Sequence, residues 1–284
     1  MKVLVIGANG QLGSDIVKAL HWEDVIPLTH QDIEIGEEAA VSGIMENYKP
    51  DVVINTAAYH RVADCEKNAL KSFGINSIGV KNLAIACREN KAILVHISTD
   101  YVFDGEKKEP YIESDSPRPL NVYGISKLAG EYCIRYLCSR HFIVRTAGLY
   151  GSAKCRAKGG NFIDLMLNLA KEQDEIEVVN DEILTPTYTL DLAREIRDLI
   201  QTDCFGLYHI TNNGSCSWYE FAEKIFEFYH MKVNLKAVPV ERFPSEVKRP
   251  HYSVLRNYAL EKIGMDDMRK WDAALKAFLS RKKE

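Results

Sequence analysis

A glycine-rich loop between an apolar strand and a helix, at the start of the chain, constrains the fold most strongly. Residues 3–6 (VLVI) form a continuous run of β-branched residues and leucine, which is typical of a parallel strand buried on both faces. The loop GANGQLG follows at 7–13, and apolar periodicity predicts a helix over 12–20. In such a loop Gly7 permits the tight turn, Gly10 lets a pyrophosphate approach the backbone, and Gly13 lets helix and strand pack closely. The free N–H groups at the helix start favour an anion, so the loop predicts a dinucleotide site.

Strands and helices then alternate along the chain, which predicts an α/β fold: a Rossmann-type doubly wound parallel sheet with a smaller C-terminal substrate-binding lobe. We expect residues 1–150 to form the NAD(P)-binding domain, with 176–210 returning to it, and residues 151–175 and 211–284 to form the lobe. In the lobe, Ser217 and Glu220 have the spacing of a capping box at a helix start. Trp218 beside them either stacks on a base or packs in the core. The predicted strands cover 3–6, 25–28, 51–55, 92–97, 142–145, 177–179 and 206–210, and the predicted helices cover 12–20, 37–48, 69–90, 161–171 and 189–201, with another from Tyr123.

Composition excludes several classes of function. The 36 basic and 40 acidic residues give a net charge of -4 without a long basic run, which argues against a nucleic-acid surface. No apolar run reaches the roughly 18 residues of a membrane span, and no secretory signal is apparent. The seven cysteines include no Cys-x-x-Cys pair, which argues against a zinc ribbon. A reducing, cytoplasmic location is therefore expected.

Tyr123 and Lys127 lie four residues apart in a predicted helix and so share one face. A nearby ammonium favours the phenolate, so we expect Lys127 to lower the pKa of Tyr123 toward the working pH of a proton donor. Thr99 follows the predicted strand 92–97, and ligands of such sheets bind beyond the carboxyl ends of the strands. The three side chains therefore form a candidate catalytic set.

The choice between NADH and NADPH stays open at the end of the second predicted strand. An acid there suits the ribose 2′-hydroxyl of NAD, whereas an arginine suits the 2′-phosphate of NADP, and neither is squarely present in THQD at 29–32. Asp32 could contact the adenine end and His30 a 2′-phosphate, or the segment is a solvated loop. The small residues Ala57 and Ala58 would let a cofactor ribose lie against the backbone.

Several blocks spread over the whole chain resemble one enzyme family. The sequence is similar to extended short-chain dehydrogenase/reductases, in particular the dTDP-4-dehydrorhamnose reductase branch, which also contains the regulatory β-subunit of methionine adenosyltransferase. The matching blocks are GANGQLG at 7–13, NTAAY at 55–59, STDYVFDG at 98–105, PLNVYGISKLAGE at 119–131, RTAGLYG at 145–151, GGNF at 159–162 and RPHYSVLRN at 249–257.

The resemblance implies specific roles at the matching positions. Thr99, Tyr123 and Lys127 become the catalytic residues, with Tyr123 as proton donor. Gly10, Gln11 and Leu12 would contact the pyrophosphate. The full predicted cofactor-binding set is Gly7, Gly10, Gln11, Leu12, Gly13, His30, Asp32, Ile33, Ala57, Ala58, Tyr59, Tyr123 and Lys127. The predicted substrate-binding set is Thr99, Asp100, Tyr101, Asn161 and Arg249.

The implied reaction is reduction by NADPH or NADH of the 4-keto group of a dTDP-linked deoxysugar, giving dTDP-L-rhamnose for cell-surface polysaccharide. The alternatives are a reductase or epimerase of another nucleotide sugar, and a non-catalytic regulatory subunit. Gly148 stands where reductases of this branch often have tryptophan, which leaves the exact sugar open. Part of the family binds Mg²⁺ at a dimer contact through acidic residues that are not matched in this sequence. Mg²⁺ is therefore possible but unsupported, and no metal-binding residue is predicted. A homodimer is the default expectation.

The basic segment at 154–158 has two interpretations. It either holds a diphosphate or forms a surface loop.

Overall fold

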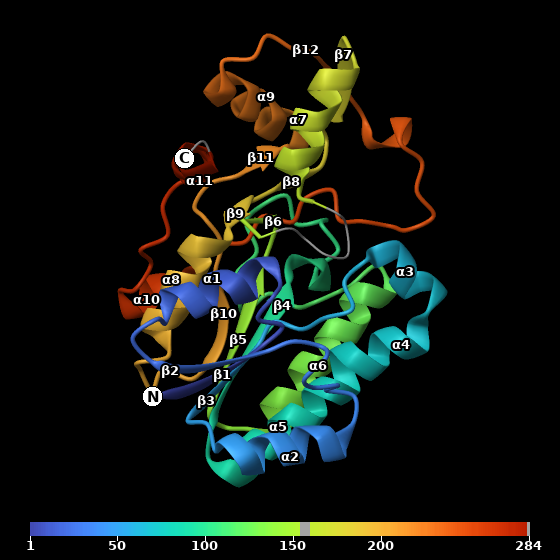
Figure 1. The fold of residues 1–284 in the computed structure, drawn as a ribbon. Coiled ribbons are helices and arrows are strands. Elements are labelled where there is room, and N and C mark those ends of the chain that lie inside the picture. The colour runs from blue at the N-terminus through green and yellow to red at the C-terminus, as the bar shows by residue number, and fades with distance from the viewer. Residues whose placement is uncertain (154–159, 283–284) are drawn as a thin grey trace.

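The computed structural model describes residues 1–153 and 160–282, and the basic segment at 154–158 lies outside them. A larger lobe is built on a six-stranded sheet, and a smaller lobe lies beyond one end of its strands (Figure 1). The N-terminus lies in the larger lobe and the last helix in the smaller one (Figure 1). No helix of the described residues has the length and apolar character that a membrane span requires.

The six strands of the large sheet are all parallel, in the order β10-β5-β4-β3-β1-β2. Strand β1 pairs with both β2 and β3, so the order of the strands reverses beside the glycine loop. This arrangement confirms the predicted doubly wound fold. The strands are β1 (Lys2–Ile6), β2 (Asp24–Leu28), β3 (Val52–Asn55), β4 (Ile93–Thr99), β5 (His141–Thr146) and β10 (Gly206–His209).

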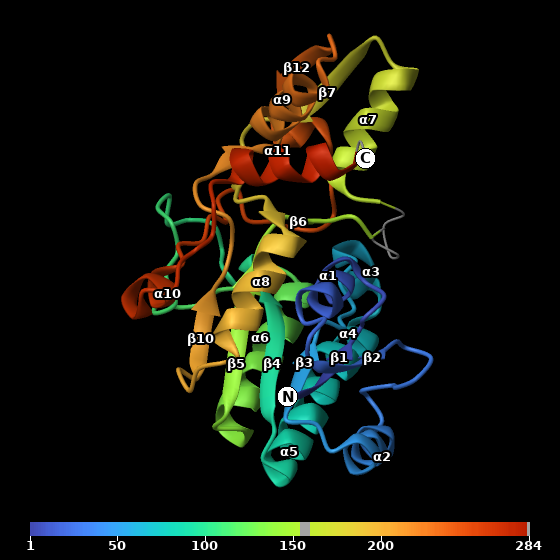
Figure 2. The same ribbon diagram turned by 60° about the vertical axis from the view of Figure 1, so that its left-hand side comes forward.

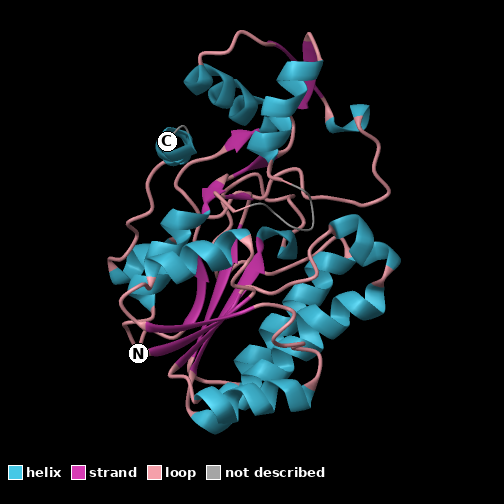
Figure 3. Cartoon of the chain, viewed as in Figure 1, coloured by secondary structure: helices cyan, strands magenta, loops and turns pink. Residues whose placement is uncertain are grey.

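Helices cover both faces of this sheet, as Figures 2 and 3 show. On one face α1 (Gln11–Ala19) packs against α8 (Thr189–Leu199), and their apolar residues join the inward side chains of β1, β3, β4 and β5 in one core. On the other face α2 (Glu38–Tyr48), α5 (Val80–Asn90) and α6 (Val122–Leu137) enclose a second core. The continuous apolar runs of the strands follow from this burial on both sides.

The segment predicted as one helix over 69–90 is divided in the structure. It consists of α4 (Ala69–Phe73), the π-helical η1 (Gly74–Gly79) and α5. A further short helix, α3 (Val62–Lys67), has no counterpart in the sequence-based prediction. These elements pack beside α6, the helix that carries Tyr123 and Lys127.

The smaller lobe has its own apolar core between helices and short sheets. The capping box of Ser217 and Glu220 is present at the start of α9, and Trp218 packs on Phe162 with 4.6 Å between ring centroids. Within 176–210, α8 and β10 lie in the large lobe, whereas β7 pairs with β12. The elements outside the large sheet and its helices are β6 (Leu149–Tyr150), α7 (Phe162–Glu172), β7 (Glu175–Val179), β8 (Ile183–Leu184), β9 (Thr187–Tyr188), β11 (Cys216–Ser217), α9 (Trp218–Tyr229), β12 (Asn234–Val238), η3 (Val240–Arg242), α10 (Tyr258–Ile263) and α11 (Trp271–Lys282).

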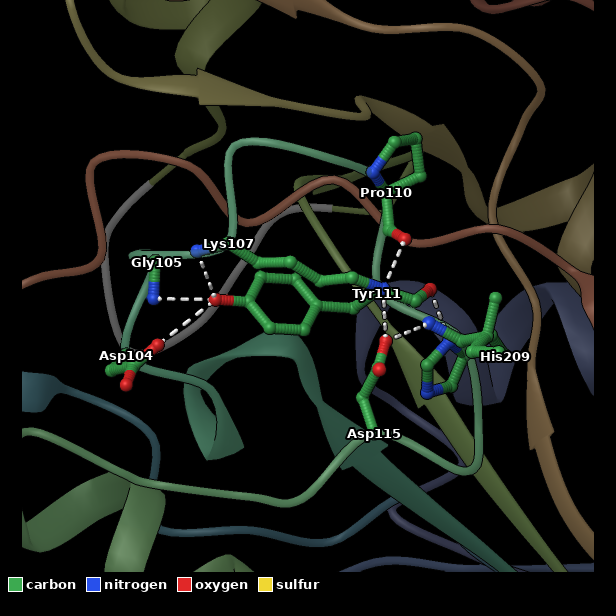
Figure 4. Close-up of polar contacts among 8 residues, drawn as sticks. Asp104, Gly105, Lys107, Pro110, Tyr111, Asp115 and His209 are labelled. Atoms are coloured by element: carbon green, nitrogen blue, oxygen red, sulfur yellow. Dashed lines mark hydrogen bonds and ion pairs between the residues drawn. The ribbon is translucent and has the colours of Figure 1, made fainter.

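A loop after β4 and the short η2 (Asp100–Val102) is fixed by the phenol of Tyr111 (Figure 4). This hydroxyl donates to Asp104 Oδ1 at 2.9 Å and accepts from the N–H groups of Gly105 at 3.0 Å and Lys107 at 3.2 Å. The Tyr111 ring stacks on Phe103, with centroids 4.1 Å apart. The loop beside the sheet rim is therefore held in one shape.

Candidate active site

A cavity of about 1760 Å³ lies between the carboxyl ends of the sheet strands and the smaller lobe. The glycine loop after β1, the segment after β3 and the end of β4 form one wall, and residues of α7, β7 and β8 form the opposite wall. Such a crevice is the ordinary ligand site of an open α/β sheet. Of the predicted site residues, these line it: Gly7, Gly10, Gln11, Leu12, Gly13, His30, Ile33, Ala57, Ala58, Thr99, Asp100, Tyr101, Tyr123, Lys127, Asn161 and Arg249.

The glycine loop leaves its backbone open to the cavity. A Cβ atom on Gly13 would lie 2.2 Å from the carbonyl oxygen of Gly7, so only glycine allows α1 to start this close to β1. Gly7 has a φ of +80°, which favours glycine at the turn. Helix α1 begins at Gln11 with no side chain capping its first N–H groups. Those free donors suit the pyrophosphate of a dinucleotide.

Tyr123 lies in the first turn of α6, where the helix start is firmly held. The Asn121 side chain caps the helix by accepting from the Gly124 N–H at 2.9 Å, and its amide donates to the Lys248 carbonyl at 2.9 Å. The Tyr123 ring meets Tyr101 edge to face, with centroids 5.8 Å apart. Burial raises the pKa of Tyr123, and a hydrogen bond with Thr99 opposes that rise. The phenol therefore keeps its proton at neutral pH.

Thr99 links Tyr123 to a buried carboxyl group. Its hydroxyl donates to Asp100 Oδ1 at 3.0 Å and also accepts from the Tyr101 N–H at 3.2 Å. Burial raises the pKa of Asp100 to about 6, although hydrogen bonds from Ser253 and Thr99 lower it. Because the Thr99 hydroxyl donates to Asp100, its oxygen can accept from the phenol of Tyr123. Tyr123, Thr99 and Asp100 can therefore form a series of hydrogen bonds in which each hydroxyl donates toward Asp100.

The expectation that Lys127 lowers the pKa of Tyr123 is wrong for this structure. Lys127 Nζ donates to the Ile97 carbonyl at 2.6 Å and lies 3.1 Å from Nε2 of His96, so it is directed at β4. Burial lowers the pKa of Lys127 to about 8, and the charge of Glu131 opposes this. Spacing along a helix places both side chains on one face, but it does not tell which partner the flexible lysine takes.

Two predicted cofactor residues are engaged elsewhere and do not line the cavity. The Asp32 carboxylate accepts from the N–H and the hydroxyl of Thr29, both at 2.8 Å, and so forms a local turn. The Tyr59 backbone is held by both ends of the Asn76 amide at 2.9 Å, and Lys71 lies over the Tyr59 ring. His30, within that turn, and Ile33, directly after it, do line the cavity.

The predicted substrate-binding residues come from both lobes. Asn161 caps α7 by accepting from the Asp164 N–H at 3.0 Å, and its amide also donates to the Gly151 carbonyl at 3.3 Å. Arg249 lines the cavity near Tyr101 and Glu182. Burial raises the pKa values of these two groups, and the charge of Arg249 opposes both rises. The sequence analysis did not propose Glu182, because a single acid in a short strand region carries no pattern.

The sequence analysis also missed the buried pair of Asn55 and His96 behind Lys127. Asn55 Nδ2 lies 3.1 Å from His96 Nδ1, and both side chains are fully buried. A usable signal was present, since one histidine interrupts the apolar run of strand β4. A polar group inside such a strand needs a hydrogen-bonding partner.

The protein family of this chain follows from its similarity to known proteins. The model of the family described as RmlD substrate binding domain matches residues 1–284. The chain belongs to this family. Among curated relatives, the spore coat polysaccharide biosynthesis protein SpsK of Bacillus subtilis (strain 168) is 40% identical over 280 residues, covering 98% of this chain and 96% of that protein.

Solved structures of this family are similar over their full length. A dTDP-4-dehydrorhamnose reductase of Clostridium acetobutylicum ATCC 824 is 45% identical, with a TM-score of 0.96 and all of both chains covered. A dTDP-4-dehydrorhamnose reductase of Bacillus anthracis str. Ames, in complex with NADP, is 41% identical, with a TM-score of 0.94 and 99% of both chains covered.

Proposed function

We propose that this chain is an NAD(P)H-dependent oxidoreductase that reduces the 4-keto group of a dTDP-linked deoxysugar, as a dTDP-4-dehydrorhamnose reductase. One observation carries the proposal: a single cavity is lined by the glycine loop, by Thr99, Tyr123 and Lys127, and by Arg249. The names of the similar reductases support the substrate class. The product, dTDP-L-rhamnose, is a precursor of cell-surface polysaccharide.

The glycine loop fits a nicotinamide dinucleotide. A Cβ at Gly13 would fill the close contact between α1 and the loop, and the uncapped helix start offers N–H donors to a pyrophosphate. Ala57 and Ala58 would adjoin a ribose, and His30 and Ile33 the adenine end. When bound, the cofactor supplies the hydride. The NADP in the similar Bacillus anthracis structure favours NADPH, whose 2′-phosphate His30 would meet, since it lines the cavity.

The chain's own groups handle the proton and the developing charge. Tyr123 keeps its proton at neutral pH because burial raises its pKa, so it can donate that proton to the oxygen of the ketone. Thr99 lies beside the phenol, and when its hydroxyl turns from Asp100 to the bound ketone it would donate to that oxygen as charge develops. Lys127 lines the same cavity and, once it leaves the Ile97 carbonyl, would hold the cofactor ribose. Arg249 offers a planar fork to the substrate diphosphate.

A panel of nucleotide-linked keto-sugars tests this proposal. Each is incubated with the purified chain and either NADPH or NADH, and oxidation of the cofactor is followed by absorbance while the sugar product is identified. We expect oxidation with the dTDP-4-keto-6-deoxysugar to exceed that with UDP- or GDP-linked ketones. Cofactor that stays bound through purification and is never consumed would favour an epimerase. No oxidation with any sugar would favour a regulatory subunit. A cytosolic location and a two-fold dimer stay predictions.

A further inference from the structure

Lys127 is held at the end of a chain of buried hydrogen bonds that starts on a different strand. Asn55 on β3 contacts Nδ1 of His96 on β4 at 3.1 Å, and Nε2 of the same ring lies 3.1 Å from Lys127 Nζ. Lys127 also donates to the Ile97 carbonyl at 2.6 Å. These three side chains are at most 1% exposed, so water cannot replace any of the partners.

The donor and acceptor roles in this series of hydrogen bonds are fixed by its first member, Asn55. The Ala57 N–H, which can only donate, lies 3.1 Å from Asn55 Oδ1. The amide oxygen of Asn55 therefore faces Ala57, and the amide NH₂ faces His96. Since an NH₂ group can only donate, Nδ1 of His96 must accept. A neutral imidazole then carries its proton on Nε2, pointing at Lys127.

This geometry constrains the protonation of Lys127. An ammonium group has three donors and no acceptor, so it would oppose the Nε2–H of His96 donor to donor. A neutral amine has a lone pair that accepts from Nε2–H while one of its own hydrogens goes to Ile97. The hydrogen bonds then all run one way, from the backbone of Ala57 to the backbone of Ile97.

We infer that Asn55 and His96 are positioning residues that hold Lys127 as a neutral amine on β4, and that protonation of Lys127 releases it from His96 toward the cavity. In that step a proton from solvent adds to the Nζ lone pair, the hydrogen bond from Nε2–H breaks, and His96 stays neutral. Lys127 already lines the cavity, so the released ammonium has space to enter. The inference concerns the lysine used in the proposed function, but it requires no substrate.

The charges around Lys127 agree with this arrangement. On its own helix Glu131 faces it, but that carboxylate is shared with Arg145 on β5 and with Ser98 on β4. Burial lowers the pKa of His96 well below its usual value, which keeps the ring neutral. Burial lowers the pKa of Lys127 to about 8, so the neutral amine prevails above about pH 8 and the ammonium prevails below it.

The tautomer of His96 tests the inference directly, and His209 is an internal control. His209 is also fully buried, but its Nδ1 lies 3.0 Å from the Tyr111 carbonyl, which can only accept (Figure 4). His209 must therefore carry its proton on Nδ1. Two-bond ¹H–¹⁵N correlation spectra of the full chain labelled at histidine report both rings between about pH 6 and pH 8.

We expect opposite tautomers, Nε2–H for His96 and Nδ1–H for His209. An Nδ1–H or doubly protonated His96 would overturn the inference. The Asn55→Asp variant sharpens the test, because a carboxylate can only accept and would reverse the chain. His96 should then change to Nδ1–H or to the imidazolium, the pKa of Lys127 from its ¹³Cε shift should rise by about one pH unit or more, and His209 should be unchanged.

An unchanged His96 tautomer in the folded variant would contradict the assigned direction. If the variant does not fold, the spectra of the parent chain still decide. Turnover of a keto-sugar is measured separately, so failure of the proposed function cannot be mistaken for failure of this inference.

Discussion

Glu131 and Arg145 form a buried two-point ion pair that ties helix α6 to strand β5. Arg145 Nε donates to Glu131 Oε1 at 2.9 Å, and a second guanidinium nitrogen donates to Oε2 at 2.6 Å. Both side chains are at most 2% exposed. Because α6 also carries Tyr123 and Lys127, this pair sets the position of the candidate catalytic helix against the sheet rim.

Replacing Glu131 with glutamine should destabilise the fold strongly. The substitution leaves the Arg145 charge buried without its counter-ion, which costs about 3 kcal/mol or more in the free energy of unfolding. Urea denaturation of the parent and the E131Q variant measures this difference. The matched control is Glu261→Gln, which breaks the more exposed pair with Arg256 and should cost less than about 1 kcal/mol. Equal losses of unfolding free energy in the two variants would contradict the view that burial makes the Glu131–Arg145 pair the more important one.

The buried carboxyl of Asp100 should make stability depend on pH. Its pKa is raised from 3.8 to about 6 by burial, so the folded state favours the protonated form. The contribution of Asp100 to the free energy of unfolding is fully present below about pH 4, and it is lost as pH rises through about 6. Asp100→Asn removes that titration. Its free energy of unfolding relative to the parent should therefore rise by about 3 kcal/mol between about pH 4 and pH 7.

The same denaturation series on Asp104→Asn provides a control of opposite sign. Hydrogen bonds from the Glu106 N–H and Tyr111 and the charge of Arg118 outweigh burial and lower the pKa of Asp104. Its carboxylate therefore contributes stability above its ordinary pKa, which is lost as pH falls through the lowered value. The Asp104→Asn variant should lose stability relative to the parent as pH rises. A pH-independent difference for Asp100→Asn would count against a raised pKa.

The order of strands and helices could be predicted from the sequence because each signal is local. Runs such as VLVI at 3–6 report burial on both faces, and Ser217 with Glu220 reports a helix start. Helix α3 was missed because its six residues carry no clear apolar period. The π-helical turn η1 was missed because residues 74–79 continue a helical pattern without any break in composition.

Most residues that line the candidate site could be predicted from the sequence, but their hydrogen-bond partners could not. Thr99 was predicted at a strand end and Tyr123 at a helix start, and the structure has both in one cavity. The partner of Lys127 depends on His96, which is 31 residues away in sequence and meets it only through the packing of α6 on β4. The spacing of residues along one helix cannot predict a contact with a residue on a distant strand. Asp32 was a candidate contact of the adenine end, but a local turn with Thr29 occupies its carboxylate.

Gly148 should tolerate no side chain without loss of stability. Its φ is +55°, and a Cβ there would lie 2.9 Å from Leu184 Cδ1 and 3.1 Å from Pro186 Cα. Gly148→Ala should lower the free energy of unfolding by about 2 kcal/mol. Gly43→Ala in helix α2 is the control, because its Cβ meets nothing within 4 Å and should stabilise the helix by about 0.5–1 kcal/mol. Thermal or urea unfolding distinguishes the two, and equal effects would argue against the strained turn.

The most direct test of the account is the rate at which Tyr123→Phe reduces the keto-sugar that the parent chain consumes, with NADPH binding measured on the same samples. Removing one hydroxyl takes away the proton donor, while the ring keeps its contact with Tyr101. The glycine loop is unchanged. We predict that turnover falls by roughly 10²–10⁴-fold while the dissociation constant of NADPH stays within about threefold of the parent value. Reduction by the phenylalanine variant at the parent rate would contradict the assignment of Tyr123 as the proton donor.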